Sequence, residues 1–188
     1  MLTAVVPVKS MELAKGRLST VLDPGGRRAL AEKMLQHVLD TLREAGLATV
    51  RMARGEAGGD LNEDAAAAAR QAAADGATDL LLVTADLPYL SAADIAAMIE
   101  AGRTSPVVIA EAKDGGTNAL LLRPPTAIGF AFATNQPSAT LHADLARKAG
   151  IEPAIVRRPG LARDIDTPAD LAALVADHPA YQVFRHVA

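Results

Sequence analysis

The sequence predicts an α/β fold with three α/β/α layers around a mostly parallel sheet. Two runs, Leu2 to Val8 and Asp79 to Thr84, are dominated by aliphatic residues without alternation, which is typical of parallel strands covered on both faces. Segments with helical spacing alternate with such strands along the chain. Because 188 residues, half of them hydrophobic, suffice for one sizeable core, we expect a single domain over residues 1–188.

Six strands are predicted from apolar runs bounded by turn residues. They cover Leu2 to Val8, Ala48 to Ala53, Asp79 to Thr84, Pro106 to Ala110, Ala119 to Leu122 and Glu152 to Val156. The fourth and fifth are joined by EAKDGGTN, residues 111–118, in which paired glycines permit a tight turn. The tail HPAYQVFRHVA, residues 178–188, could pack as a terminal strand or join a partner subunit.

Five helices are predicted from apolar spacing, alanine content and capping residues. They cover Arg27 to Ala45, Glu63 to Ala74, Ser91 to Ala101, Thr140 to Ala149 and Pro168 to Ala176. Gly46 is placed to end the first helix, and alanine, the best helix former, fills the second. The third begins with SAAD, a capping box in which Asp replaces the usual Glu, and Thr167 caps the last.

Composition excludes several classes of function. A net charge of −3 gives no general attraction to nucleic acid. The chain has no cysteine, so disulfides, thiolate zinc sites and a cysteine nucleophile are excluded, and its four scattered histidines do not suggest a zinc site. A strand from Leu2 leaves no room for a signal peptide, and no apolar run approaches the roughly 20 residues that cross a bilayer. We therefore expect a cytoplasmic protein without membrane or nucleic-acid partners.

A basic cluster follows the first predicted strand. Lys9, Lys15 and Arg17 lie within nine positions, and in sheets of this type ligands bind beyond the carboxyl ends of the strands. The segment lacks both the phosphate-binding P-loop motif and the glycine motif of dinucleotide folds, so side chains would have to supply the counter-charge for a polyanion. The alternative is that these residues are solvated on a surface loop.

Acidic residues follow two later predicted strands. Asp86 comes just after the strand ending at Thr84, and Asp164 and Asp166 are two apart, so in an extended segment they point the same way. Carboxylates at these positions suit a hard cation such as Mg²⁺, which also takes phosphate oxygens. Each segment could instead be an ordinary helix entry. Together, three acids near a basic cluster are what a metal-bridged triphosphate needs.

Five motifs carry a resemblance to a known family: VPVK, AKGRL, ADLP, GGTNALLL and DIDTPADL, in that order. The chain resembles the 2-phospho-L-lactate guanylyltransferase family of deazaflavin coenzyme F-420 biosynthesis over most of its length. The resemblance implies a fold like that of nucleotide-diphospho-sugar transferases and transfer of GMP from GTP, with Mg²⁺, to a small phosphorylated acid, releasing pyrophosphate. Family members use 2-phospho-L-lactate, phosphoenolpyruvate or 3-phospho-D-glycerate as acceptor. A homodimer is also consistent with the resemblance.

The resemblance implies roles for the charged residues. Lys9 falls at the acceptor's phosphate, whereas Lys15 and Arg17 fall at the phosphates of the nucleotide, and these three are the catalytic candidates. Asp86, with Asp164 and Asp166, matches the metal-binding acids. Asp86 is also expected beside the nucleotide.

The resemblance also assigns polar residues and shows two departures. Thr117, Asn118 and Ser138 match the acceptor-binding positions, and Leu61 and Asn62 resemble a block near the nucleoside. The chain has room for about one strand before Asn62 where the family has two strands and a helix, so the fold is expected to be short by one β/α unit. The family's FGPGS stretch reads ATNQPS here, residues 133–138, which keeps Ser138 and His142 in register but loses the glycines.

Two other functions remain open at this stage. The chain could be another nucleotidylyltransferase, such as one acting on a molybdenum cofactor precursor, although those open with a glycine-rich loop and this chain has no glycine before Gly16. It could also be a degenerate, non-catalytic nucleotide-binding domain. For the guanylyltransferase reading no general base is required, because a phosphate monoester has a second pKa near 6 and is already largely ionised at neutral pH.

Overall fold

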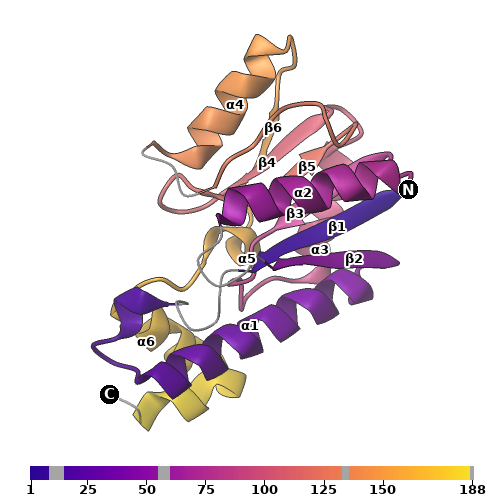
Figure 1. Cartoon of the computed structure of the whole chain (residues 1–188). Helices are drawn as coiled ribbons and strands as arrows, with labels where there is room; N and C mark the ends of the chain where they lie inside the picture. The colour runs from indigo at the N-terminus through magenta and orange to yellow at the C-terminus, as the bar shows by residue number, and fades with distance from the viewer. Residues whose placement is uncertain (9–14, 55–59, 133–135, 187–188) are drawn as a thin grey trace.

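The computed structural model describes residues 1–8, 15–54, 60–132 and 136–186 (Figure 1). The strands are β1 (Leu2–Val8), β2 (Thr49–Arg54), β3 (Asp79–Val83), β4 (Val107–Glu111), β5 (Thr117–Leu122) and β6 (Ala154–Val156). The α-helices are α1 (Pro24–Glu44), α2 (Leu61–Ala74), α3 (Ala92–Ala101), α4 (Ser138–Lys148), α5 (Pro159–Ala162) and α6 (Pro168–Asp177). Two 3₁₀-helices, η1 (Gly16–Leu18) and η2 (Pro179–His186), complete the described elements.

The strands form one mixed sheet in the order β2-β1-β3-β5-β4-β6. Strands β1, β2 and β3 pair in parallel, and so do β4 and β6, whereas β5 is antiparallel to both of its neighbours. The sheet is therefore mostly parallel, as predicted. Because β5 runs in the opposite direction, its first residues lie at the edge where the parallel strands end.

Helices cover both faces of the sheet, which confirms the predicted three layers (Figure 1). On one face α1 and α3 pack against the sheet in one apolar cluster, and on the other α2 and α4 pack in a second. Neighbouring residues of β1 belong to different clusters: Ala4 and Val6 face α1, and Val5 faces α2. This two-sided burial explains why the strand is hydrophobic without alternation.

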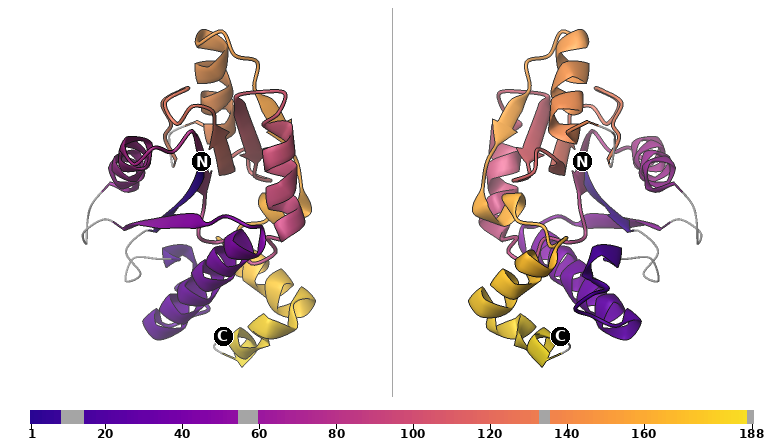
Figure 2. Two further views of the ribbon diagram at one scale, coloured as in Figure 1. Left: turned by 90° about the vertical axis from the view of Figure 1, so that its right-hand side faces the viewer. Right: turned by 90° about the vertical axis from the view of Figure 1, so that its left-hand side faces the viewer.

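A third apolar cluster lies beyond the sheet, around the amino-terminal half of α1. At about 1.5 Å per residue, the 21 residues of α1 span roughly 30 Å, so the helix extends past the strands. Its Leu30 and Met34 pack with residues of α6 and η2, including the buried Tyr181 and Phe184. Figure 2 shows α6 and η2, in yellow, together with α1 at the lower end of the molecule.

Several element boundaries differ from the predictions for identifiable reasons. Helix α1 begins at Pro24 because the carboxylate of Asp23 accepts a hydrogen bond from Gly26 N and caps it. The tail forms the 3₁₀-helix η2, so the suggested terminal strand is wrong. The capping box predicted at Ser91 and the cap predicted at Thr167 are both present, and Thr167 also closes a capping box with Asp170.

Two other sequence expectations concern missing elements. Between α1 and α2 the described residues contain one strand, β2, which agrees with the expectation of room for about one strand there. Among the described helices, none combines the length and apolar composition needed to cross a bilayer.

Candidate active site at the carboxyl edge of the sheet

The three predicted acids meet at the carboxyl edge of the sheet. Asp86, Asp164 and Asp166 are half-buried, and each offers a carboxylate oxygen within 4.8 Å of the others. Asp86 follows β3, where the buried Leu87 anchors the loop. Between the other two acids, Ile165 is buried in the third apolar cluster, so Asp164 and Asp166 share the opposite side, as expected for an extended segment.

Lys15 inserts its ammonium group into this acidic cluster. Its Nζ lies 2.6 Å from Asp86 Oδ2 and 3.0 Å from Asp166 Oδ1, and its side chain is 9% exposed. Burial alone would lower the pKa of Lys15, but the attraction of Asp86 and Asp166 outweighs it and holds the pKa above its usual value. The lysine is therefore charged, and it neutralises part of the acidic cluster.

The backbone around Lys15 is unusual. Its φ of 56° places it in the left-handed region, which few residues other than glycine adopt, and the 3₁₀-helix η1 follows directly. Arg17, on η1, is largely exposed, and its Nη1 lies 3.4 Å from Asp166 Oδ2. The structure thus brings two of the three predicted basic residues to the acids, whereas Lys9 lies outside the described residues.

Asp164 is the least compensated of the three acids. Burial raises its pKa first, and the negative charges of Asp86 and Asp166 raise it further. Asn118 is a polar neighbour, whose Nδ2 lies 3.4 Å from Asp164 Oδ1 and also donates to Leu161 O at 2.8 Å. A carboxyl group in this position favours an added cation beside it.

Strand β5 supplies two polar side chains to the same edge. Thr117 and Asn118 are its first residues, and both are buried. The carbonyl of Asn118 accepts a hydrogen bond from Thr84 N, which joins β5 to the end of β3. Thr117 Oγ1 lies 2.9 Å from Nδ1 of His142, which is buried in α4. The GGTN motif therefore contacts two places: Asn118 contacts the acidic cluster, and Thr117 contacts helix α4.

The remaining predicted residues lie at the amino ends of two helices. Ser138 is the first residue of α4, one helical turn before His142, and it is buried. Leu61 and Asn62 begin α2, which Asp60 caps by accepting from Asn62 N. The side-chain Oδ1 of Asn62 accepts from the backbone N–H of Phe132 at 2.6 Å. The preceding residue, Ala131, donates its backbone N–H to His142 Nε2. The backbone of residues 131–132 therefore links the starts of α2 and α4.

Sequence reasoning missed three residues that hold the acidic segments. The Arg163 guanidinium stacks 3.9 Å from the centroid of the Tyr89 ring, and its Nη2 lies 3.0 Å from the hydroxyl of that tyrosine. Lys113, in the β4–β5 turn, forms an ion pair with Asp170, which closes the capping box of α6. The sequence did hint at the pairing of Tyr89 with Arg163, because each lies close to a predicted metal-binding acid. Tyr89 is three residues after Asp86, and Arg163 immediately precedes Asp164.

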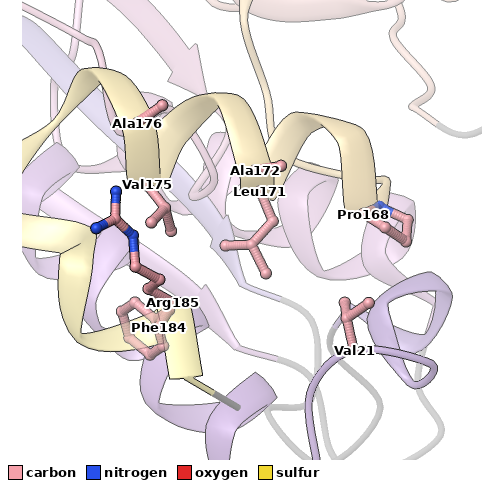
Figure 3. A pocket seen from close by; sticks show the side chains of 8 residues that line it. All are labelled: Val21, Pro168, Leu171, Ala172, Val175, Ala176, Phe184 and Arg185. Carbon is pink, nitrogen blue, oxygen red and sulfur yellow. The ribbon is translucent and has the colours of Figure 1, made fainter. Parts of the chain in front are cut away.

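An apolar cavity lies apart from these residues, between α6, η2 and Val21 (Figure 3). Its volume of about 260 Å³ is below the roughly 300 to 1,000 Å³ of typical ligand pockets. Its lining side chains, drawn as sticks, include Leu171 and Phe184 but none of the predicted site residues. The charged edge of the sheet, and not this cavity, is therefore the candidate active site.

The fold is like that of nucleotide-diphospho-sugar transferases and cytidylyltransferases. A solved structure of a putative nucleotide-diphospho-sugar transferase from Desulfovibrio desulfuricans matches with a TM-score of 0.75 at 18% identity, covering 98% of this chain and 94% of the other. The 2-C-methyl-D-erythritol 4-phosphate cytidylyltransferase of Thermus thermophilus matches with a TM-score of 0.56 at 17% identity, covering 97% and 98%. At such identities these matches show a shared fold.

Sequence comparison narrows the class to one family. The family model described as "Guanylyl transferase CofC like" matches residues 2–180. The chain is 40% identical to the phosphoenolpyruvate guanylyltransferase of Rubrobacter xylanophilus, over 92% of this chain and 93% of that protein. It is 36% identical to the 2-phospho-L-lactate guanylyltransferase of Halorubrum lacusprofundi, over 91% and 82%. The chain therefore belongs to the CofC-like guanylyl transferase family, and the resemblance seen in its motifs is confirmed.

Proposed function

We propose that this enzyme transfers GMP from GTP to a small phosphorylated acid and releases pyrophosphate, as a step in coenzyme F-420 biosynthesis. The observation that carries the proposal is the joining of Lys15, Asp86 and Asp166 in one ion-pair cluster at the edge where Asn118 contacts Asp164. The names of the curated relatives supply the nucleotide and the class of acceptor. Of the three acceptors, phosphoenolpyruvate is favoured, because the relative at 40% identity bears that name.

The acidic cluster fits a Mg²⁺ ion. Asp86, Asp164 and Asp166 would hold it, since each offers a hard oxygen ligand within 4.8 Å of the others and the crowded Asp164 has a raised pKa. When bound, Mg²⁺ neutralises charge on the phosphates of the nucleotide. Lys15 would then be free to leave its two carboxylates and contact the triphosphate.

The reaction forms one phosphorus–oxygen bond and breaks another. An oxygen of the acceptor's phosphate attacks the α-phosphorus of GTP, and the bond to the β-phosphate breaks, so pyrophosphate leaves with the electron pair. The chief obstacle is repulsion between two anions, which costs about 4 kcal/mol for unit charges about 4 Å apart at an effective dielectric constant of 20. We assign Lys15 and Arg17 to offsetting this repulsion at the nucleotide's phosphates and Lys9 to the phosphate of the acceptor.

The uncharged groups are assigned to the two substrates. Thr117, Asn118 and Ser138 would bind the acceptor. The first two begin β5, and Ser138 begins α4, the helix that contacts Thr117 through His142. Leu61 and Asn62 would lie on the nucleoside side, at the start of α2. The second assignment is the less direct one, since Asn62 Oδ1 already accepts a hydrogen bond from Phe132.

Turnover by the purified full chain tests the proposal. Each of GTP, ATP, CTP and UTP is incubated with each of the three acceptors and Mg²⁺, and both pyrophosphate and the product, in which a diphosphate joins the nucleoside to the acid, are measured. We expect turnover with GTP, and its loss in Asp86→Asn. Asp144→Asn, which changes an exposed acid on α4, is the matched control and should behave as the unchanged protein. Absence of product from every combination would refute the proposal.

A further inference from the structure

His142 is a buried histidine to which the proposed reaction assigns no role. It lies on α4 with no exposed surface, and both of its ring nitrogens have polar neighbours. Nδ1 lies 2.9 Å from Thr117 Oγ1, and Nε2 lies 3.2 Å from the backbone N of Ala131. A fully buried imidazole with both nitrogens used is fixed in orientation.

The two contacts determine which nitrogen carries the proton. A backbone N–H can only donate, so Nε2 must be bare and accept from Ala131. A neutral imidazole with a bare Nε2 carries its proton on Nδ1. Nδ1 therefore donates to Thr117 Oγ1. Burial lowers the pKa of His142 to about 4, so the ring stays neutral at neutral pH.

This tautomer decides what the Thr117 hydroxyl can offer to a ligand. Having accepted from His142, the hydroxyl keeps its own hydrogen, and no other side chain or backbone group among the described residues accepts it. In the opposite tautomer, with the proton on Nε2, the hydroxyl would donate its hydrogen bond to the bare Nδ1. It would then present only lone pairs to a ligand, and lone pairs repel an anion. His142 thus converts Thr117 into a hydrogen-bond donor suited to a phosphate or carboxylate oxygen.

The same histidine also secures a segment that reaches the nucleoside side. Ala131 and Phe132 are adjacent, and their backbone N–H groups donate to His142 on α4 and to Asn62 on α2, respectively. The ring of Phe132 lies edge-on to that of His142, with centroids 5.7 Å apart. Hydrogen bonds therefore connect Asn62 to Thr117 through His142 and the backbone of residues 131–132.

We propose that His142 is a positioning residue for the acceptor, which holds the Thr117 hydroxyl as a donor toward an anionic oxygen. The role rests on the proposed function, because it takes the start of β5 as the acceptor side. It goes beyond that function in naming which hydrogen bond prepares the hydroxyl and which tautomer is required. His142 itself need not touch either substrate.

Two conservative variants separate the two contacts of the ring. In His142→Asn, the side-chain amide can stand where Nδ1 stood and still donate to Thr117. In His142→Gln, the longer side chain can place its carbonyl oxygen where Nε2 stood and still accept from Ala131, but the donor to Thr117 is lost. We expect His142→Gln to raise KM for the acceptor by about tenfold with KM for GTP changed less than twofold, and His142→Asn to stay closer to the unchanged protein.

Thr117→Val completes a double-mutant cycle. If His142 acts through the hydroxyl, adding His142→Gln to Thr117→Val should cause no further rise in KM for the acceptor. Additive effects would overturn the proposal. Equal effects on the KM values for acceptor and GTP would do the same, because they would indicate a general loss of structure.

The tautomer is testable without any turnover. Long-range ¹H–¹⁵N correlation spectra of the ¹⁵N-labelled full chain distinguish a protonated ring nitrogen from a bare one. At neutral pH we expect His142 to show a protonated Nδ1 and a bare Nε2, and the reverse pattern would overturn the assignment. Absence of turnover in the unchanged protein would overturn the proposed function and this role with it, whereas turnover with an unaltered acceptor KM in His142→Gln would overturn the role alone.

Discussion

Acid should destabilise this fold through His142, by an amount that follows from its burial. The pKa of His142 is about 4 in the folded protein and about 6.5 in the unfolded chain, because burial removes the water that would stabilise the charged ring. Between these values the unfolded chain binds a proton that the folded chain does not, so the free energy of unfolding falls as the pH falls. The loss begins below pH 6.5 and is complete below about pH 4. At about 1.36 kcal/mol per pH unit, it amounts to roughly 3 kcal/mol.

Urea unfolding at a series of pH values measures this loss. His142→Gln is the reference, because an amide does not titrate while the ionisable groups of the rest of the chain are unchanged. From pH 7 to pH 5 the free energy of unfolding of the unchanged protein should fall by about 2 kcal/mol more than that of the variant, and by about 3 kcal/mol more at pH 4. Curves that run parallel over the whole range would refute the reasoning.

Three further outcomes are expected. Asp164→Asn should weaken Mn²⁺ binding at least tenfold in calorimetry of the nucleotide-free protein, and equal affinity in this variant and in the control Asp144→Asn would contradict the metal assignment. Lys15→Met should lower kcat/KM for GTP by about 100-fold or more, whereas circular dichroism should still show a folded protein. Thr167→Ala removes the cap of α6 and should lower the free energy of unfolding by about 1 kcal/mol in urea, and an effect near zero would mean that the capping box is not stabilising.

The sequence predicted well those features that depend on local patterns. The bounds of β1 are as predicted, because a strand buried on both faces has a clear apolar run with polar residues beyond it. The capping box at Ser91 and the cap at Thr167 are local as well, since each capping side chain bonds to a residue only three positions later. The convergence of Asp86 with Asp164 and Asp166 was also predictable, because their loops follow β3 and β6, two strands that run in the same direction in one sheet.

Features that depend on contacts between distant segments were not predictable in this way. Strand β5 begins at Thr117 and not at Ala119, because two polar residues at its start are satisfied by partners from other elements. Helix α5 has only four residues, too few to show a period. In the tail, Tyr181 and Phe184 are three apart, which fits one face of a 3₁₀-helix as well as an irregular segment.

The two sides of the candidate active site differ in how firmly the fold holds them in place. Thr117 and Asn118 belong to an interior strand with neighbours on both sides, so they can shift only if the central sheet distorts. Lys15 lies in the connection between β1 and α1, in a left-handed backbone conformation. Its side chain is held by ion pairs with Asp86 and Asp166. If Thr117 and Asn118 bind the acceptor and Lys15 the nucleotide, as proposed, the acceptor meets a rigid surface, and the segment around Lys15 is the part that adjusts when the triphosphate binds.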